Sequence, residues 1–456
     1  MKLKGIEIKK IGGHSYAYKV TTVWDKERKK RRKVSKYLGK WVDGKIAKVA
    51  ERHPRGVYEL GNVALLWTAV KESGLDRLLE KFFPEDRDEI LLLSLNRVAN
   101  PQPLKSVQSW YEKTYLAKMI KPTASPKSLS ACLGRIGVDG TAQRDFFNAL
   151  ITVDEKLVYD TSAIFSYSKK LNLAELGYNK DDLLLPKVNV LLAFSKAKRQ
   201  PCYIRLVPGS VMDVKTLRVF IEEIRDKTAF VILDKGFLDW HNFELLESAD
   251  FNFVLPLRRN SKVIDYKKRP TGWFVYRKRV IKYMSYPYRS FRIYLYEDIL
   301  LRAMEENEFY VLKNLGHDVS FHKERAGKIA LISNVRLKPQ EAFLLYKSRD
   351  EVEKAFDVFK NLLQVDTPYL RDETSLRGYV FVVFIGLFLY YHLLKRITEL
   401  GLNRKMSVRD VLLELSKVYA IEVAGNDIVS EVPKKARFLL DSFGLELDLF
   451  PKLVRS

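Results

Sequence analysis

The chain has 456 residues, of which 47% are hydrophobic, a composition that supports folded cores and excludes a generically disordered protein. Lysine and arginine number 80 against 56 acidic residues, and this net charge of +24 favours a polyanionic partner, nucleic acid before membrane. The two cysteines, Cys132 and Cys202, exclude a disulfide framework or a Cys-x-x-Cys motif, and they indicate a reducing, cytoplasmic location.

The excess positive charge is concentrated in two segments. Residues 1–50 contain 16 basic and 4 acidic residues, and residues 258–292 contain 12 basic residues and one acidic residue. Two such clusters favour two separate contacts with a polyanion, although a solvated surface is the alternative for each run alone. Arg31 and Arg32 are the expected nucleic-acid contacts in the first segment.

The first 150 residues divide into a β part and a helical part. Apolar and polar residues alternate on both sides of Gly12 and Gly13, which predicts a β-hairpin, and a second strand pair is expected across residues 25–31. Residues 1–50 are therefore interpreted as a small basic β unit. Residues 51–150 show apolar residues at three- and four-residue spacing, with breaks at Pro and Gly, and are predicted to be helical.

Residues 151–257 change to alternating strands and helices. The run that ends at Asp234 is continuously apolar, as is typical of a strand buried on both faces. The element order predicts a mixed sheet with helices, an α/β fold class. We expect strands over residues 157–167, 188–194, 202–209, 229–234 and 251–257, and helices over residues 214–226 and 238–249.

Residues 258–328 interrupt this alternation. Aromatic and basic residues are interleaved there, which predicts a β-rich basic insertion that begins with Arg258 and Arg259. Trp273 offers the largest ring for stacking on an unpaired base, and packing in the insertion's own small core is the alternative.

The rest of the chain is predicted to be largely helical. Residues 329–400 complete the core, and C-terminal helices follow over residues 401–456. The 17 residues 378–394 are apolar enough to resemble a membrane span, but they include His392. We expect a buried core helix there and no membrane association.

Three acidic residues stand out by their context. Asp160 lies inside a predicted strand, where an unpaired charge would be costly. Asp234 ends a buried strand, the place where α/β sheets put their chemistry. Glu353 lies on a helix predicted over residues 339–363. Each acid alone is more often a cap or an ion-pair partner than a catalytic group.

The predicted helix of Glu353 carries a polar stripe. At 100° per residue, Tyr346, Arg349, Glu353 and Lys360 fall together beside the apolar face of the helix. Such a stripe can face a cleft on the sheet. A ladder of helical ion pairs is the alternative, because Arg349 and Glu353 are four residues apart.

These residues also fit a known pattern. The segment YKSRDEVEKAFDVFK has the spacing Tyr-x2-Arg-x3-Glu-x6-Lys from Tyr346 to Lys360. It resembles the signature of transposases of the IS4-like group, IS1634 branch, whose two aspartate motifs resemble VYDTSAIF around Asp160 and VILDKGF around Asp234. The resemblance covers about residues 157–400 and implies an RNase H-like catalytic domain with a β-rich insertion.

The resemblance implies a cut-and-paste DNA transposase of an insertion sequence. It assigns catalysis and the binding of two Mg²⁺ or Mn²⁺ ions to Asp160, Asp234 and Glu353, since carboxylates are the hard oxygen ligands that Mg²⁺ prefers. Tyr346, Arg349 and Lys360 would contact DNA phosphates beside the cut.

The predicted reaction also implies partners and leaves two alternatives. The protein would assemble as a homodimer on double-stranded DNA, with residues 51–150 serving end recognition or dimerisation. One alternative is a catalytically inactive or domesticated DNA-binding protein, against which the intact acidic set argues. The other is a standalone RNase H-like nuclease, against which the two additional basic regions argue.

Overall fold

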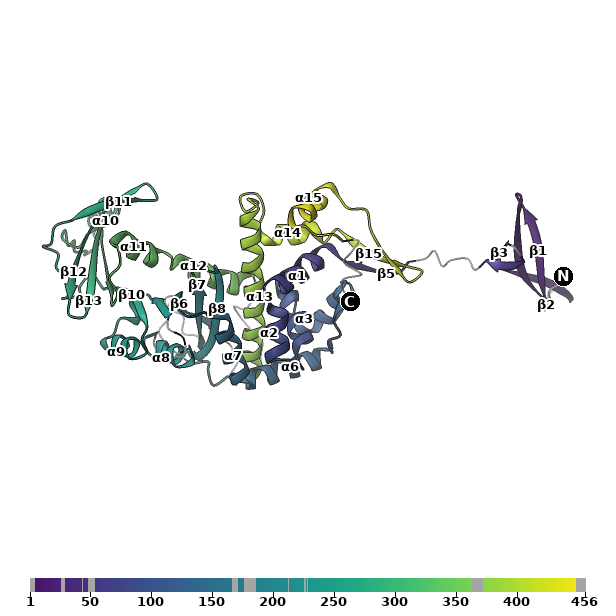
Figure 1. Cartoon of the computed structure of the whole chain (residues 1–456), viewed down its shortest axis with the longest axis horizontal. Coiled ribbons are helices and arrows are strands. Elements are labelled where there is room, and N and C mark those ends of the chain that lie inside the picture. Colours follow the sequence, from purple (N-terminus) through teal and green to yellow (C-terminus); the bar gives the residue numbers. More distant parts are fainter. Residues whose placement is uncertain are drawn as a thin grey trace. The chain divides into compact units, whose positions relative to one another are not determined.

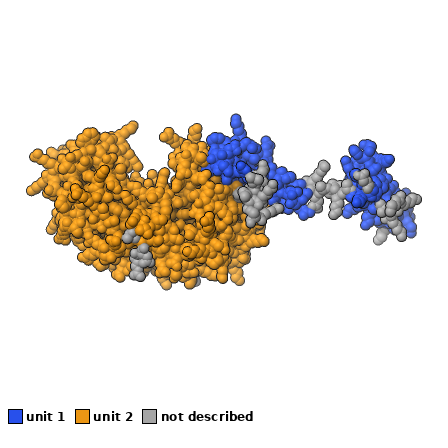
Figure 2. Space-filling model, in the orientation of Figure 1, with its two compact units in different colours: residues 1–61, 415–456 blue, residues 62–414 orange. Residues whose placement is uncertain are grey.

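The computed structural model describes residues 5–25, 29–42, 44–47, 54–165, 171–175, 186–211, 213–224, 227, 229–362 and 372–447. The chain forms two compact units, which Figure 2 distinguishes by colour: residues 1–61 with 415–456, and residues 62–414.

The basic N-terminal segment forms a four-stranded antiparallel sheet in the order β1-β2-β3-β4. Its first turn is the predicted hairpin, in which Gly12 and Gly13 have φ angles of 57° and 80°, a left-handed conformation that glycine adopts at little cost. The second predicted strand pair is also confirmed, since Asp25 lies opposite Lys30. The strands are β1 (Ile6–Ile11), β2 (His14–Asp25), β3 (Lys30–Val42) and β4 (Lys45–Ala47).

A second small sheet joins distant parts of the same unit. β5 (Pro54–Glu59) pairs with β15 (Tyr419–Val423), which pairs with β16 (Asn426–Val429). Only helices were predicted in residues 51–150 and 401–456, so that prediction was wrong for all three strands of this sheet. The predicted helices are present as α14 (Val408–Leu415) and α15 (Lys434–Phe443).

The helical region packs around one long apolar helix, α13 (Glu373–Glu399). It has the length and composition of a membrane span, but 72% of its apolar window is buried inside the structure, as predicted for a core helix. It crosses α6 so closely that a Cβ on Gly137 would lie 1.7 Å from the carbonyl oxygen of Thr374. The region comprises α1 (Gly61–Glu72), α2 (Leu75–Phe82), α3 (Arg87–Ala99), α4 (Leu104–Glu112), α5 (Leu116–Met119), α6 (Pro126–Val138) and α7 (Gly140–Leu150).

The centre of the larger unit is a mixed sheet in the order β10-β9-β6-β7-β8, of which Figure 1 labels β10, β6, β7 and β8. β6, β9 and β10 are parallel, and β7 runs antiparallel to both of its neighbours. This arrangement confirms the predicted RNase H-like α/β fold. Its elements are β6 (Glu155–Phe165), β7 (Lys187–Ser195), β8 (Gln200–Pro208), α8 (Asp213–Ile224), β9 (Ala229–Ile232), α9 (Trp240–Ser248) and β10 (Asn252–Pro256). The last predicted positions of the strand over 157–167 and the helix over 214–226 lie outside the described residues.

The predicted insertion continues this sheet. β14 (Lys328–Ser333) pairs with β10 on one side and with β13 (Phe291–Asp298) on the other. β12 (Arg279–Tyr288) and β11 (Gly272–Tyr276) then complete nine strands. A helix that the sequence analysis did not predict, α10 (Ile299–Asn314), follows β13 and has no buried residue.

The helix predicted over residues 339–363 is divided. α11 (Pro339–Lys347) ends at Ser348, whose hydroxyl donates to the carbonyl oxygen of Leu345 at 2.6 Å. α12 (Asp350–Asp357) follows and changes into a π-helical turn over Val358–Leu362. Position 363 lies outside the described residues.

Candidate active site

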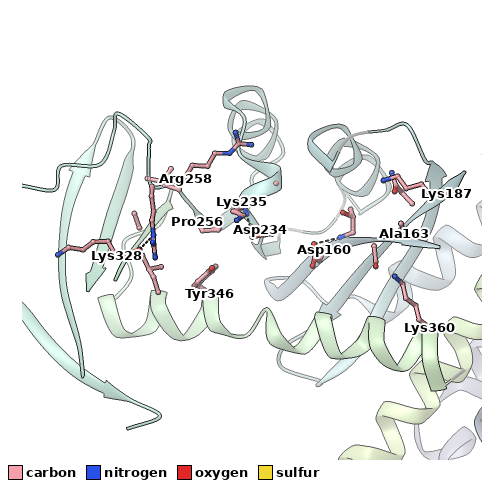
Figure 3. Close-up of a pocket in the computed structure, with 18 of the residues that line it drawn as sticks. Asp160, Ala163, Lys187, Asp234, Lys235, Pro256, Arg258, Lys328, Tyr346 and Lys360 are labelled. Carbon is pink, nitrogen blue, oxygen red and sulfur yellow. Dashed lines mark hydrogen bonds between the residues drawn. The ribbon is translucent and has the colours of Figure 1, made fainter. Parts of the chain in front are cut away.

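Two acidic side chains belong to neighbouring parallel segments of the sheet: Asp160 lies on β6, and Asp234 lies two residues beyond the end of β9. Val158 of β6 lies opposite Ile232, the last residue of β9. Asp160 and Asp234 each follow two residues later, so they occupy corresponding positions in the two parallel segments. Neighbouring strands are about 4.8 Å apart, and residues at one level point to one face. The two predicted carboxylates therefore border one cavity, as Figure 3 shows.

Each of these carboxylates is oriented by its own backbone. Oδ1 of Asp160 accepts a hydrogen bond from the N–H of Thr161 at 2.8 Å. Oδ1 of Asp234 accepts one from the N–H of Lys235 at 2.6 Å, where the chain leaves the strand. Both side chains are half-buried. Their positions are thus set by the end of the sheet.

The third predicted acid is held by an arginine. Oε1 of Glu353 accepts a hydrogen bond from Nη2 of Arg349 at 3.0 Å, and the Glu353 side chain is 56% exposed. The Arg349 side chain is only 13% exposed, and its Nη1 lies 2.8 Å from Oδ1 of Asp234. One guanidinium therefore bridges two of the three predicted catalytic acids.

The donor set fits a divalent cation in part. Within the described part of the chain, no three acidic, histidine or cysteine side chains lie close enough together to hold a metal ion. Asp160 and Asp234 nevertheless present hard oxygen ligands to the same cavity. Glu353 would complete the set only by turning away from Arg349.

Tyr346 and Lys360 border the same cavity from the helical segment. Oη of Tyr346 accepts a hydrogen bond from Arg349 at 3.4 Å, and the guanidinium lies 5.5 Å from the tyrosine ring centre. Burial raises the pKa of Tyr346 above its usual value, so its hydroxyl keeps its proton at neutral pH. The structure thus brings Tyr346, Arg349 and Lys360 to the site, although the helix between them is not continuous.

The cavity measures about 990 Å³, and apart from Asp160 and Asp234 the charged residues that border it are all basic. A concave surface of this charge attracts a phosphodiester backbone. The basic residues are Lys187, Lys235, Arg258, Arg259, Lys328 and Lys360.

The other predicted DNA contacts have different positions. Arg258 and Arg259 border the cavity, and Arg259 also pairs with both carboxylate oxygens of Glu305, at 3.0 and 2.8 Å. Trp273 lies on β11 and is 67% exposed, so the alternative that it packs in the insertion's core is wrong. Arg31 and Arg32 belong to the N-terminal sheet, in the other unit.

Sequence reasoning missed three of the lysines at this cavity, Lys187, Lys235 and Lys328. Lys187 begins β7 opposite Phe165 and is buried, and Lys328 begins β14. A lysine at the start of an apolar strand is a usable signal, since lysine is seldom buried without a reason. Lys328 begins the apolar strand β14 in the same way, and Lys235 directly follows Asp234.

Comparisons with known proteins identify the family of the chain. Residues 152–389, just over half of the chain, match the family model of the transposase DDE domain. A comparison with curated proteins finds no match. A solved piggyBac transposase synaptic complex with hairpin DNA is similar at 11% identity and a TM-score of 0.42, over 81% of this chain and 73% of that chain. Since the family model spans the sheet, both aspartates and Glu353, the chain belongs to the transposases with a DDE domain.

Proposed function

We propose that this transposase cuts DNA at the ends of an insertion sequence and joins those ends to target DNA by a cut-and-paste reaction. One observation carries the proposal: Asp160 and Asp234 border one cavity whose other charged residues are basic. Acidic groups suit metal ligation, and the basic surround suits the substrate's phosphates.

Asp160 and Asp234 would hold Mg²⁺ or Mn²⁺, with Glu353 as the third ligand once it leaves Arg349. Two such ions can activate the attacking oxygen and stabilise the leaving oxygen of a phosphodiester. The main-chain hydrogen bonds to both aspartates keep their carboxylates oriented toward the cavity.

The residues around the acids would position the DNA strand. Lys360 and Arg258 would contact phosphates on either side of the cut, and the protonated hydroxyl of Tyr346 would donate a hydrogen bond to a third. Arg349, released from Glu353, would neutralise charge on the strand end.

The finer assignments belong to the same proposal. The spacing Tyr-x2-Arg-x3-Glu-x6-Lys supports membership of the IS4-like group and its IS1634 branch. A homodimer on DNA and a cytoplasmic location are further parts of it. The Trp273 ring, exposed on β11, is proposed to stack on an unpaired base of a distorted end.

A plasmid that carries the DNA flanking this gene tests the reaction. We expect nicks at inverted repeats and joined products with Mg²⁺ or Mn²⁺, and none with EDTA. Asp234→Asn should lose both activities. Glu244→Gln is the matched control, because this neighbouring acid on α9 is 79% exposed and lies outside the cavity.

The two alternatives predict other products. Cutting without preference for the repeats and without joining would identify a standalone nuclease. Salt-dependent DNA binding with no cutting in either metal would identify an inactive DNA-binding protein.

A further inference from the structure

Among the described residues, the hairpin of β2 and β3 extends beyond the other strands of the N-terminal sheet. β1 pairs with β2 only as far as Lys19, and β4 pairs with β3 only from Lys40. Residues 21–25 and 30–34 are therefore paired with each other alone among the described strands. We call these ten residues the N-terminal ribbon.

The N-terminal ribbon is almost wholly exposed. Every residue in it is exposed except Asp25, which is half-buried. Its apolar side chains are not sheltered, since Val23, Trp24 and Val34 are 53%, 57% and 42% exposed. A two-stranded hairpin is marginally stable by itself in water, so a ribbon of this kind gains from a partner.

The positive charge of the ribbon indicates a partner that carries negative charge. Four consecutive basic residues, Lys30 to Lys33, face the single acid Asp25 in the ribbon. Lys33 pairs with Glu7 at 2.8 Å, both on the surface, whereas Arg31 and Arg32 pair with none of the residues that the structure describes. Unpaired, exposed guanidinium groups suit phosphates and base edges.

The strand register separates the ribbon into two unlike faces. Trp24 lies opposite Arg31 and Thr22 opposite Lys33, which places an aromatic ring and hydrogen-bonding groups on one face. The other face has Asp25 opposite Lys30, with Val23 opposite Arg32. Only the second face carries an acid of the ribbon itself.

The size of the ribbon matches one groove of duplex DNA. Five residue pairs at about 3.4 Å span about 17 Å, the length of about five base pairs. The major groove is about 12 Å wide and admits a two-stranded ribbon without distortion of the duplex, whereas the minor groove of undistorted DNA is only about 6 Å wide.

We propose that the N-terminal ribbon enters the major groove of double-stranded DNA, with the face of Trp24 and Arg31 toward the base edges. Arg31 donates hydrogen bonds to bases, and the Trp24 ring contacts apolar base edges such as thymine methyl groups. Arg32, on the opposite face, points away from the groove floor. The inference rests on the proposed function only for the choice of DNA as the partner.

Adjacent arginines with opposite orientation provide the test. The full chain is titrated into a fluorescein-labelled duplex in the presence of EDTA, and binding is followed by fluorescence anisotropy. Arg31→Ala should weaken duplex binding at least about fivefold, as expected for one lost base contact. Arg32→Ala removes the same charge and should weaken binding clearly less. Thermal unfolding of each variant should match wild type, since both side chains are exposed.

A second matched pair and two competitors complete the experiment. Trp24→Ala should weaken binding and Val23→Ala should not, because the two exposed side chains lie on opposite faces. Netropsin, which occupies the minor groove, should leave binding unchanged, and unlabelled single strands should compete poorly.

Each contrary result overturns the inference. Equal losses of duplex affinity for Arg31→Ala and Arg32→Ala would mean that the ribbon contributes only nonspecific electrostatic attraction to binding. Equal competition by single strands, or displacement by netropsin, would contradict major-groove binding. The binding assay contains EDTA and is therefore independent of cutting. A chain that binds DNA through the ribbon but does not cut it when Mg²⁺ or Mn²⁺ is supplied would support this inference and contradict the proposed function.

Discussion

Replacing Arg349 by alanine tests whether the bridge between two acids belongs to a buried site or to an exposed helix surface. The guanidinium is 13% exposed and contacts Asp234 at 2.8 Å and Glu353 at 3.0 Å. Arg349 and Glu353 are four residues apart, and the Glu353 side chain is 56% exposed. We therefore expect this ion pair to contribute about 0.3–0.5 kcal/mol to the free energy of unfolding. The contact with the half-buried Asp234 is a charged hydrogen bond, worth about 1.5–3 kcal/mol.

We therefore expect Arg349→Ala to lower the free energy of unfolding by about 2–3 kcal/mol in EDTA. Urea unfolding of the full chain, followed by circular dichroism, measures it. Arg218→Ala is the matched control, because Arg218 and Glu222 form an i, i+4 pair at 2.7 Å with both side chains more than half exposed. That control should cost at most about 0.5 kcal/mol.

Magnesium adds a second measurement to the same variant. If Arg349 neutralises Asp234 where a cation would bind, the Arg349→Ala chain should bind Mg²⁺ more tightly than wild type in calorimetric titration. It should also regain part of its lost stability with Mg²⁺. An Arg349→Ala chain that is as stable as the Arg218→Ala control and binds Mg²⁺ like wild type would refute the reasoning, since Arg349 would then be an ordinary surface ion pair.

Three further predictions concern the cavity and the insertion. Asp160→Asn, Asp234→Asn and Glu353→Gln should each abolish metal-dependent cleavage in a nicking assay while duplex binding is retained, and any one of them that cuts at the wild-type rate is not a ligand. Lys360→Ala should lower the slope of log affinity against log salt by roughly 0.9, because one phosphate contact is lost. If this variant shows the wild-type salt dependence and normal strand transfer, Lys360 does not belong to the site. Trp273→Ala should change the free energy of unfolding by less than about 0.5 kcal/mol because the ring is 67% exposed; a drop of several degrees in melting temperature would contradict this placement.

The core strands could be predicted because burial leaves a clear pattern in the sequence. β9 is a continuous apolar run, and all four of its residues are buried. The same reason explains why α10 was missed. Its apolar residues Leu300, Met304 and Val311 are about half-exposed, and no residue of the helix is buried, so no apolar face indicated a neighbour.

The site could be predicted only as a set of residue types. Sequence context and the resemblance to a transposase signature indicated Asp160, Asp234 and Glu353. The contact between Arg349 and Asp234, however, joins two segments that are distant in sequence. Helical periodicity cannot reveal such a contact. Periodicity also missed the division of the helix at Ser348, where neither Pro nor Gly gives a signal.

The position of β14 has a consequence for the order in which the chain assembles. β14 lies between β13 and β10, although both of those strands are synthesised before it. Until Ser333 has left the ribosome, β10 and β13 each present an open edge, and open edges invite pairing with another chain. Closing the sheet then needs contacts between residues far apart in sequence, which slows folding. Nascent chains that end before β14 should therefore be the species most prone to aggregate and most dependent on chaperones.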